Sequence, residues 1–441
     1  MKSITGKNFF LFGVISMLII LITLDCLRKD HFNEDYTPMF FKNTGEWVSF
    51  ENAFSQSQNT LSSHFTMFTS NYLMEHKVYS NFSPKKLPPH SFDKHLRNKG
   101  FETKAICGVS FLANLLGNQI GEKDKKFDFE GNSIYRKCLR KLSKERRSAE
   151  DVFKEGIRFL SKSKSRDIFL WLHLFDAHMP YFSPKKFKNF EIVKSEKSVK
   201  EQIDEKGWFS PYFKEYEKKL ELTYFPNCYK SAVSYIDYEM DNFFMFLKNK
   251  NIFDETLIFV TADHGECLLG DHYIYCAHKK LFDDTINVPF FVKFPQKIFS
   301  GEKVFEIVEH LDIAPTVISR IGLEEERLRG EDLFKLLHGK GKKREFSFSE
   351  HVDNFMQSVR DDKYIYSEVV ENVPNKWGIK MEEGKLFTRD GTEVKDKNIE
   401  DTMKVKMDEL IKEIQSSSKK EEDSLESDKK IEEQLKSLGY L

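Results

Sequence analysis

Short apolar stretches alternate along the chain with longer segments whose apolar residues recur at helical spacing. Continuous apolar runs of strand length are typical of parallel strands that are buried on both faces. Such runs cover residues 17–25, 47–55, 167–175, 256–263 and 288–295. Helical periodicity covers residues 148–163, 229–251 and 312–323. Because strands alternate with helices, we expect an α/β fold, a three-layer αβα sandwich around a largely parallel mixed sheet.

The pattern changes near residue 335, where a basic linker, GKGKKRE, precedes short alternating segments and a helical stretch. This change predicts a main domain over residues 17–335 and a small C-terminal α+β subdomain over residues 336–414. Residues 415–441 are charged and rich in serine before an amphipathic end. That composition is typical of a flexible segment that leads into a terminal helix.

The N-terminal apolar segment has two interpretations. Residues 9–24 are almost continuously apolar and follow two lysines, a pattern that resembles a signal sequence or membrane anchor. The run is shorter than the about 20 residues that span a bilayer, and it ends at Asp25. A buried strand that begins at Met17 explains it equally well, with residues 1–16 as an N-terminal extension that translation from Met17 would omit. We adopt the strand, with membrane contact through residues 9–24 as the alternative.

Composition narrows the class of partner and the compartment. The chain has 69 basic and 70 acidic residues and a net charge of −1. This balance gives no reason to expect a nucleic acid as partner. None of the six cysteines belongs to a CxxC pair, and such scattered thiols suit a reducing compartment better than a disulfide framework. We therefore expect a cytoplasmic protein, or a membrane-anchored one under the alternative above. The oligomeric state is left open.

Polar residues that carry chemistry follow two of the apolar runs. Asp25 ends the first run, and Asp263 and His264 follow the fourth. Because the carboxyl ends of parallel strands meet at one edge of a sheet, a site can be built there. A third stretch, QNTLSSHFTMFTS (residues 58–70), places Thr60 at a predicted junction between a loop and a helix. The N–H groups of a helix N-terminus attract anions, and a nearby cation activates a hydroxyl for attack on phosphorus or sulfur.

Together these stretches resemble the sulfatase family of the alkaline phosphatase superfamily. The segment LITLDCLRKDH resembles the first metal strand of the family, and TLSSHFTMFTS resembles its nucleophile segment. Further segments fit in the order that the family has them: HLFDAHMPY, TADHGE, HKKLFDDTINVPFFVKFP, HLDIAPTVISRIGL and LKSLGYL. The resemblance covers nearly the whole chain.

The resemblance implies a metal-dependent active site. Asp25, Asp263 and His264 would ligate one divalent metal ion, and Thr60 would be the nucleophile and touch the same ion. Carboxylate ligands suit Ca²⁺ or Mg²⁺, while the imidazole makes Mn²⁺ or Zn²⁺ equally suitable, so the identity of the metal is left open. A second ion would need more ligands than the sequence offers, so we expect one.

The resemblance also implies residues that face the substrate. His178 would contact the anionic oxygens of the ester. Either His278 or Lys279 would help to balance charge or protonate the leaving group, and the choice between them is left open. His173 is interpreted as a structural histidine. The expected partner is a small-molecule or glycan ester of sulfate or phosphate.

The nucleophile segment departs from the formylglycine type of sulfatase. That type carries Cys or Ser at the position of Thr60, and a threonine cannot become the formylglycine aldehyde. Ser62 and His64 stand in place of the motif's Pro and Arg, and Cys26 stands where many sulfatases have a second ligating Asp. These departures favour an unmodified threonine hydroxyl as the nucleophile.

We therefore predict a metal-dependent hydrolase of sulfate or phosphate esters that works through Thr60. One alternative is a phosphodiesterase or phosphoglycerol-type transferase, in which an alcohol replaces the attacking water. The other is an inactive family member that binds an anionic glycan or head group. Thr60 in place of Cys, and the lack of an Arg at position 64, are the best support for the inactive alternative.

Overall fold

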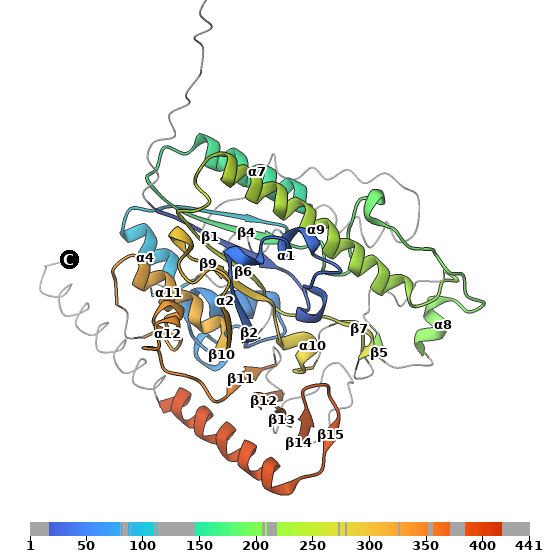
Figure 1. Cartoon of the computed structure of the whole chain (residues 1–441). Helices are drawn as coiled ribbons and strands as arrows, with labels where there is room; N and C mark the ends of the chain where they lie inside the picture. The colour runs from blue at the N-terminus through green and yellow to red at the C-terminus, as the bar shows by residue number, and fades with distance from the viewer. Residues whose placement is uncertain are drawn as a thin grey trace, which may run out of the picture.

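The computed structural model shows a twisted sheet between two layers of helices, with a smaller sheet beside it (Figure 1). The structure describes residues 17–79, 81, 87–88, 90–109, 112, 146–204, 208–209, 218–271, 274–277, 280–324, 327–351, 356–370 and 384–416.

The central sheet has seven strands in the order β10-β2-β9-β6-β1-β4-β3. Every neighbouring pair is parallel except the two pairs that β9 makes with β2 and β6. This is the largely parallel mixed sheet that the sequence predicts. Its strands are β1 (Met17–Leu24), β2 (Val48–Phe54), β3 (Glu102–Cys107), β4 (Asp167–Leu174), β6 (Thr256–Ala262), β9 (Phe290–Lys293) and β10 (Lys303–Glu309).

The structure confirms the five predicted strands as β1, β2, β4, β6 and β9, and it adds β3 and β10, which the sequence analysis did not predict. These two strands form the edges of the sheet. The first residues of each are largely exposed or half-buried and include charged side chains such as Glu102 and Lys303. Neither strand therefore shows the continuous apolar run of a strand that is buried on both faces.

Helices cover both faces of the sheet (Figure 1). α7 (Ala149–Lys162) and α9 (Tyr224–Asn249) pack together on one face, and α2 (Thr60–Thr69), α4 (Phe92–Asn98) and α11 (Ile313–Arg320) pack together on the other. The three-layer αβα sandwich is thus confirmed, and α7, α9 and α11 correspond to the three predicted helical segments. The shorter elements are η1 (Lys29–His31), α1 (Pro38–Phe41), η2 (Thr44–Glu46), α3 (Leu73–His76), η4 (Lys185–Phe187), α8 (Val199–Asp204), α10 (Asp283–Ile286), η6 (Pro295–Lys297), η7 (His310–Asp312) and α12 (Leu333–Leu337).

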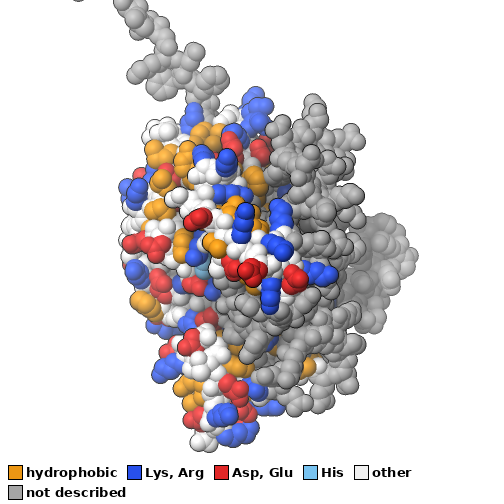
Figure 2. Space-filling model, turned by 90° about the vertical axis from the view of Figure 1, so that its right-hand side faces the viewer, with side chains coloured by type: hydrophobic (Ala, Val, Ile, Leu, Met, Phe, Trp, Pro, Cys, Tyr) orange, Lys and Arg blue, Asp and Glu red, His pale blue; other side chains and the backbone are white. Residues whose placement is uncertain are grey.

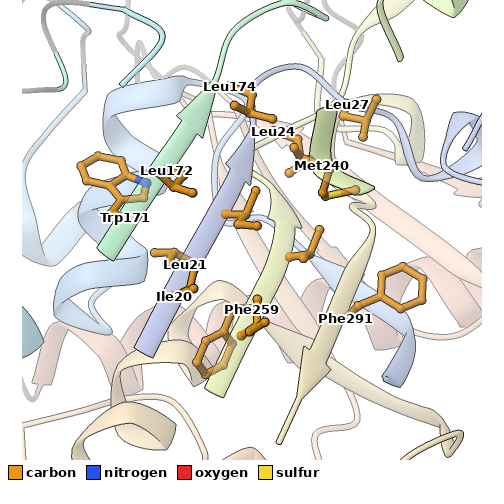
Figure 3. Packing of buried hydrophobic residues seen from close by; sticks show 14 of the residues in the cluster. Ile20, Leu21, Leu24, Leu27, Trp171, Leu172, Leu174, Met240, Phe259 and Phe291 are labelled. Atoms are coloured by element: carbon orange, nitrogen blue, oxygen red, sulfur yellow. The ribbon is translucent and has the colours of Figure 1, made fainter. Parts of the chain in front are cut away.

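The hydrophobic core lies where the central strands run side by side (Figure 3). Ile20 of β1, Leu172 of β4 and Phe259 of β6 are completely buried there. Full burial of one such side chain stabilises the fold by about 1.5–3 kcal/mol. The core therefore holds the carboxyl ends of these strands at fixed positions.

The strand register brings the polar residues after β1 and β6 to the same edge. Leu24 pairs with Leu174 of β4 on one side and with Ala262 of β6 on the other. The next residue, Asp25, donates its backbone N–H to the carbonyl oxygen of Leu174 at 2.9 Å. Asp25 and Asp263 therefore leave their strands at the same level.

The second half of the N-terminal apolar run is the buried central strand β1, as the strand interpretation predicts. Residues 9–16 of that run lie outside the described residues. Among the helices that the structure describes, none has the length and apolar character needed to cross a bilayer.

A five-stranded antiparallel sheet and a helix over residues 397–416 form the small α+β unit expected near the C-terminus. Met403 and Met407 of this helix pack on Phe348 and Val359 of the sheet. The boundary at residue 335 stays a prediction. The strands of the sheet are β11 (Ser347–Glu350), β12 (Met356–Arg360), β13 (Tyr364–Val369), β14 (Lys385–Thr388) and β15 (Glu393–Val394). A three-stranded sheet contains β5 (Trp208–Phe209), β8 (Ile274–Ala277) and β7 (Cys267–Asp271).

Charges of both signs are mixed on the face of the molecule shown in Figure 2. Lys and Arg side chains lie next to Asp and Glu side chains across its described part. This mixing agrees with the net charge of −1. On this face, neighbouring charges of opposite sign largely cancel at a distance.

Candidate active site

Two buried carboxylates lie at the carboxyl edge of the central sheet. Asp25 and Asp263 are both completely buried. Asp263 Oδ1 accepts the backbone N–H groups of Cys26 at 3.2 Å and of His264 at 2.8 Å. Asp263 Oδ2 and Asp25 Oδ1 have no hydrogen-bond partner among the described residues. Burial, and next the charge of Asp25, raise the pKa of Asp263 above its usual value.

His264 directs its Nε2 atom toward the same space. Its Nδ1 lies 2.9 Å from the carbonyl oxygen of Gly265, which can only accept a hydrogen bond. Nδ1 therefore carries the proton in the neutral ring, and Nε2 is the unprotonated nitrogen. Nε2 lies 3.4 Å from Thr60 Oγ1 and 3.7 Å from Asp263 Oδ2. A carbonyl that fixes one ring nitrogen and so orients the other is common in metal-binding histidines.

Thr60 is the first residue of α2, next to the cap residue Asn59. The Asn59 side chain accepts the backbone N–H of Ser62 at 3.5 Å, which fixes the start of the helix. Thr60 Oγ1 lies 3.3 Å from Asp25 Oδ2 and 3.4 Å from His264 Nε2, and only 1% of the residue is exposed. The structure thus brings Thr60 together with the predicted metal ligands.

His178 lies on the loop after β4, near Asp25. Its Nδ1 is 2.7 Å from the carbonyl oxygen of Met179, and its ring stacks on Phe175 with 4.3 Å between the ring centres. A ring nitrogen of His178, the sulfur of Cys26 and a carboxylate oxygen of Asp25 lie within 4.8 Å of one another. Burial lowers the pKa of His178 to about 4, so the ring is neutral at neutral pH.

Arg146 is a functional candidate that the sequence analysis missed. Its guanidinium donates to the carbonyl oxygen of Met179 at 2.5 Å and lies 4.4 Å from the centre of the Phe175 ring. His178 stacks on the same Phe175 ring. The guanidinium of Arg146 therefore places a positive charge close to His178. No motif marks position 146, so no signal in the sequence alone identifies it.

His278 and Lys279 lie outside the described residues. Their suggested part in protonating the leaving group stays a prediction.

His64, which replaces the Arg of the family motif, is held in a chain of hydrogen bonds. Its Nδ1 donates to the carbonyl oxygen of Thr60 at 2.6 Å. Its Nε2 lies 3.0 Å from Thr23 Oγ1, which in turn accepts the indole N–H of Trp171 at 2.9 Å. Burial, and next the neighbouring His173, lower the pKa of His64 to about 3. A neutral imidazole therefore fixes the first turn of α2, where the motif would place a cation.

The arrangement fits one divalent metal ion. Asp25, Asp263 and His264 each offer one ligand atom, and these atoms lie within 4.8 Å of one another. Atoms bound to one ion at about 2.0–2.2 Å lie roughly 3–3.6 Å apart. The distances from Thr60 Oγ1 to Asp25 and His264, 3.3 and 3.4 Å, are of that size. A bound ion would also satisfy carboxylate oxygens that otherwise lack a partner.

Gly265 allows the loop that carries His264 to approach its neighbour closely. The N–H of Gly265 donates to the Thr285 carbonyl oxygen at 2.8 Å, and a Cβ at position 265 would lie 2.1 Å from the carbonyl oxygen of Asp284. Gly265→Ala should therefore displace His264 and weaken binding of Mn²⁺ or Zn²⁺ about 10- to 100-fold, measured by titration calorimetry. Gly45→Ala is the matched control, because a Cβ there meets nothing within 4 Å. Equal affinity in both variants would show that the loop tolerates a Cβ.

The chain belongs to the sulfatase family. The family model described as "Sulfatase" matches residues 18–323, and the model described as "N-sulphoglucosamine sulphohydrolase, C-terminal" matches residues 270–420. The chain is 31% identical to steryl-sulfatase of Homo sapiens over 147 residues, which cover 30% of this chain and 25% of the human protein. It is 26% identical to an arylsulfatase of Clostridium perfringens (strain 13 / Type A) over 236 residues, which cover 48% of this chain and 47% of that protein. The chain thus spans half or less of these relatives.

Solved structures show the same fold over a larger share of the chain. A phosphonate monoester hydrolase from Silicibacter pomeroyi has a TM-score of 0.65 at 17% identity, covering 90% of this chain and 95% of that one. A 2-O GAG sulfatase has a TM-score of 0.66 at 15% identity, covering 93% and 94%. At these identities the likeness concerns the fold.

Proposed function

We propose that the chain is a metal-dependent hydrolase of sulfate or phosphate esters, with Thr60 as the nucleophile. The position of Thr60 Oγ1 carries this proposal, because it lies 3.3 Å from Asp25 Oδ2 and 3.4 Å from His264 Nε2. Its place at the N-terminus of α2 adds a positive dipole that favours an anionic ester. Membership of the sulfatase family supports the class of reaction.

The reaction begins with attack by Thr60 Oγ1 on sulfur or phosphorus, in line with the departing alcohol. A bond from Oγ1 to that atom forms while the bond to the bridging ester oxygen breaks. The hydroxyl proton leaves to a neighbouring acceptor, of which Asp25 Oδ2 is the closest identified. A divalent ion, when bound, supplies positive charge that lowers the pKa of the hydroxyl and screens the anionic ester. Water then cleaves the threonine ester and restores the hydroxyl.

Other described side chains would hold the ester. His178 is oriented by Met179 and Phe175. Because its Nδ1 faces the Met179 carbonyl oxygen, the neutral ring leaves Nε2 as an acceptor, so a hydrogen bond from His178 to an anionic ester oxygen requires the ring to take up a proton when the ester binds. Arg146 adds a positive charge close to His178, which favours an anionic ester there. We keep His278 or Lys279 as the proposed proton donor to the leaving alcohol.

The threonine also restricts how the covalent intermediate is released. Oxidation of a secondary alcohol gives a ketone, so Thr60 cannot become the aldehyde of formylglycine. The intermediate must therefore be released by attack of water on sulfur or phosphorus, a route shared by phosphate and sulfate esters.

Removal of metal is expected to abolish turnover. The full chain would be treated with a chelator and assayed on nitrophenyl sulfate, phosphate, phosphodiester and phosphonate, each with added Ca²⁺, Mg²⁺, Mn²⁺ or Zn²⁺. The proposal predicts no activity after chelation and recovery with at least one cation on at least one ester. Failure of every ester with every cation would contradict it and favour an inactive binding protein.

A further inference from the structure

The ring of His173, a residue of β4, lies beside Asp25 of the proposed metal centre. His173 pairs in register with Thr23 of β1, two residues before Asp25, and it is completely buried. Neither ring nitrogen has a hydrogen-bond partner among the described residues. A buried imidazole with both nitrogens unsatisfied is costly, so the residue needs a partner that the described part of the chain does not provide.

The distance between His173 and Asp25 is close to the distance between two atoms that bind the same metal ion. His173 Nε2 lies 3.2 Å from Asp25 Oδ2, yet the contact lacks the geometry of a hydrogen bond. Two ligand atoms about 2.1 Å from one tetrahedral ion lie roughly 3.4 Å apart, and closer at higher coordination. Ligand atoms of His173 and Asp263 also lie within 4.8 Å of each other.

The neighbouring His64 is not available as a metal ligand. His64 lies within the same group of atoms as His173 and Asp263. Its Nδ1 is bonded to the Thr60 carbonyl at 2.6 Å, and its Nε2 to Thr23 Oγ1 at 3.0 Å. Both nitrogens of His64 are therefore used by the protein, so of these two histidines His173 is the one with unused ring nitrogens among the described residues.

We infer that His173 is a further ligand of the metal centre, beside Asp25, Asp263 and His264. The inference rests on the metal centre of the proposed function and adds a second nitrogen ligand to it. Two imidazoles favour Zn²⁺, Mn²⁺ or another first-row transition ion over Ca²⁺ and Mg²⁺, which prefer oxygen ligands. The inference therefore predicts a transition-metal ion at this centre.

Metal affinity tests this inference without an activity assay. Titration of metal-free full chain with Zn²⁺, Mn²⁺ and Ca²⁺ should show much tighter binding of a transition ion than of Ca²⁺. His173→Ala should weaken Zn²⁺ or Mn²⁺ binding about 100-fold and Ca²⁺ binding much less. His310→Ala is the matched control, because His310 is equally buried but its Nε2 faces Thr261 Oγ1 at 3.4 Å.

X-ray absorption of the zinc-loaded wild-type chain tests the same point if His173→Ala fails to fold. A fit of the spectrum should give two imidazole ligands on the zinc ion, His264 and His173. Tight binding with one imidazole, or unchanged affinity in folded His173→Ala, would overturn the inference and leave the proposed function standing. If the wild-type chain binds none of these ions, the metal centre of the proposed function fails as well.

Discussion

Replacing Thr60 by alanine is expected to lower kcat by about 10⁴-fold or more, because it removes the hydroxyl that forms the proposed covalent ester. Asp25, Asp263 and His264 remain in Thr60→Ala, so bound metal measured by elemental analysis should stay close to the wild-type amount. Thr60→Ser retains a hydroxyl and should keep a measurable fraction of the activity.

Thr69→Ala is the control for this substitution. Thr69 lies in the same helix and is equally buried, but its hydroxyl donates to the Phe65 carbonyl oxygen at 2.7 Å, within the helix. Its activity should stay near that of the wild type. Substantial turnover by metal-loaded Thr60→Ala would assign the attack to water or to another residue.

Arg344→Ala is expected to destabilise the fold by about 3–5 kcal/mol, because it leaves two buried carboxylates without their cation. The guanidinium donates to both oxygens of Asp312 at 2.7 Å, and its Nε lies 3.2 Å from Glu309 Oε2. Asp312 is completely buried and Glu309 nearly so. Because Arg344 precedes β11, this cluster attaches the C-terminal sheet to η7 beside the central sheet. Denaturant unfolding followed by circular dichroism measures the loss.

Lys343→Ala is the control for Arg344→Ala. It removes a basic residue from the same linker without affecting the buried carboxylates. The Lys343 side chain is 68% exposed and pairs with Glu306 at the surface. Such an exposed pair contributes about 0–1 kcal/mol. Similar unfolding midpoints for the Arg344 and Lys343 variants would contradict the stabilising part assigned to Arg344.

The central strands could be predicted from the sequence because they are buried on both faces and read as continuous apolar runs. The edge strands β3 and β10 could not, since each carries charged residues in its exposed half. The same logic located Asp25 and Asp263, because an acidic residue directly after a buried parallel strand must lie at the edge of the sheet.

The remaining site residues depend on packing that a linear pattern does not contain. His173 lies within the apolar run DIFLWLHLF, where a histidine looks like any other core residue. Only its register with Thr23 and its distance to Asp25 separate it from a structural histidine. Arg146 is likewise identified only by its contacts with Met179 and Phe175.

The most direct test of the central claim is to trap the covalent intermediate. The metal-loaded chain would be mixed with an activated ester that it turns over, quenched in acid within the first turnover, digested and analysed by mass spectrometry. The account predicts a sulfate or phosphate adduct on Thr60 in the peptide that contains residues 58–70, and no such adduct in Thr60→Ala. Turnover accompanied by an adduct on another residue would contradict it.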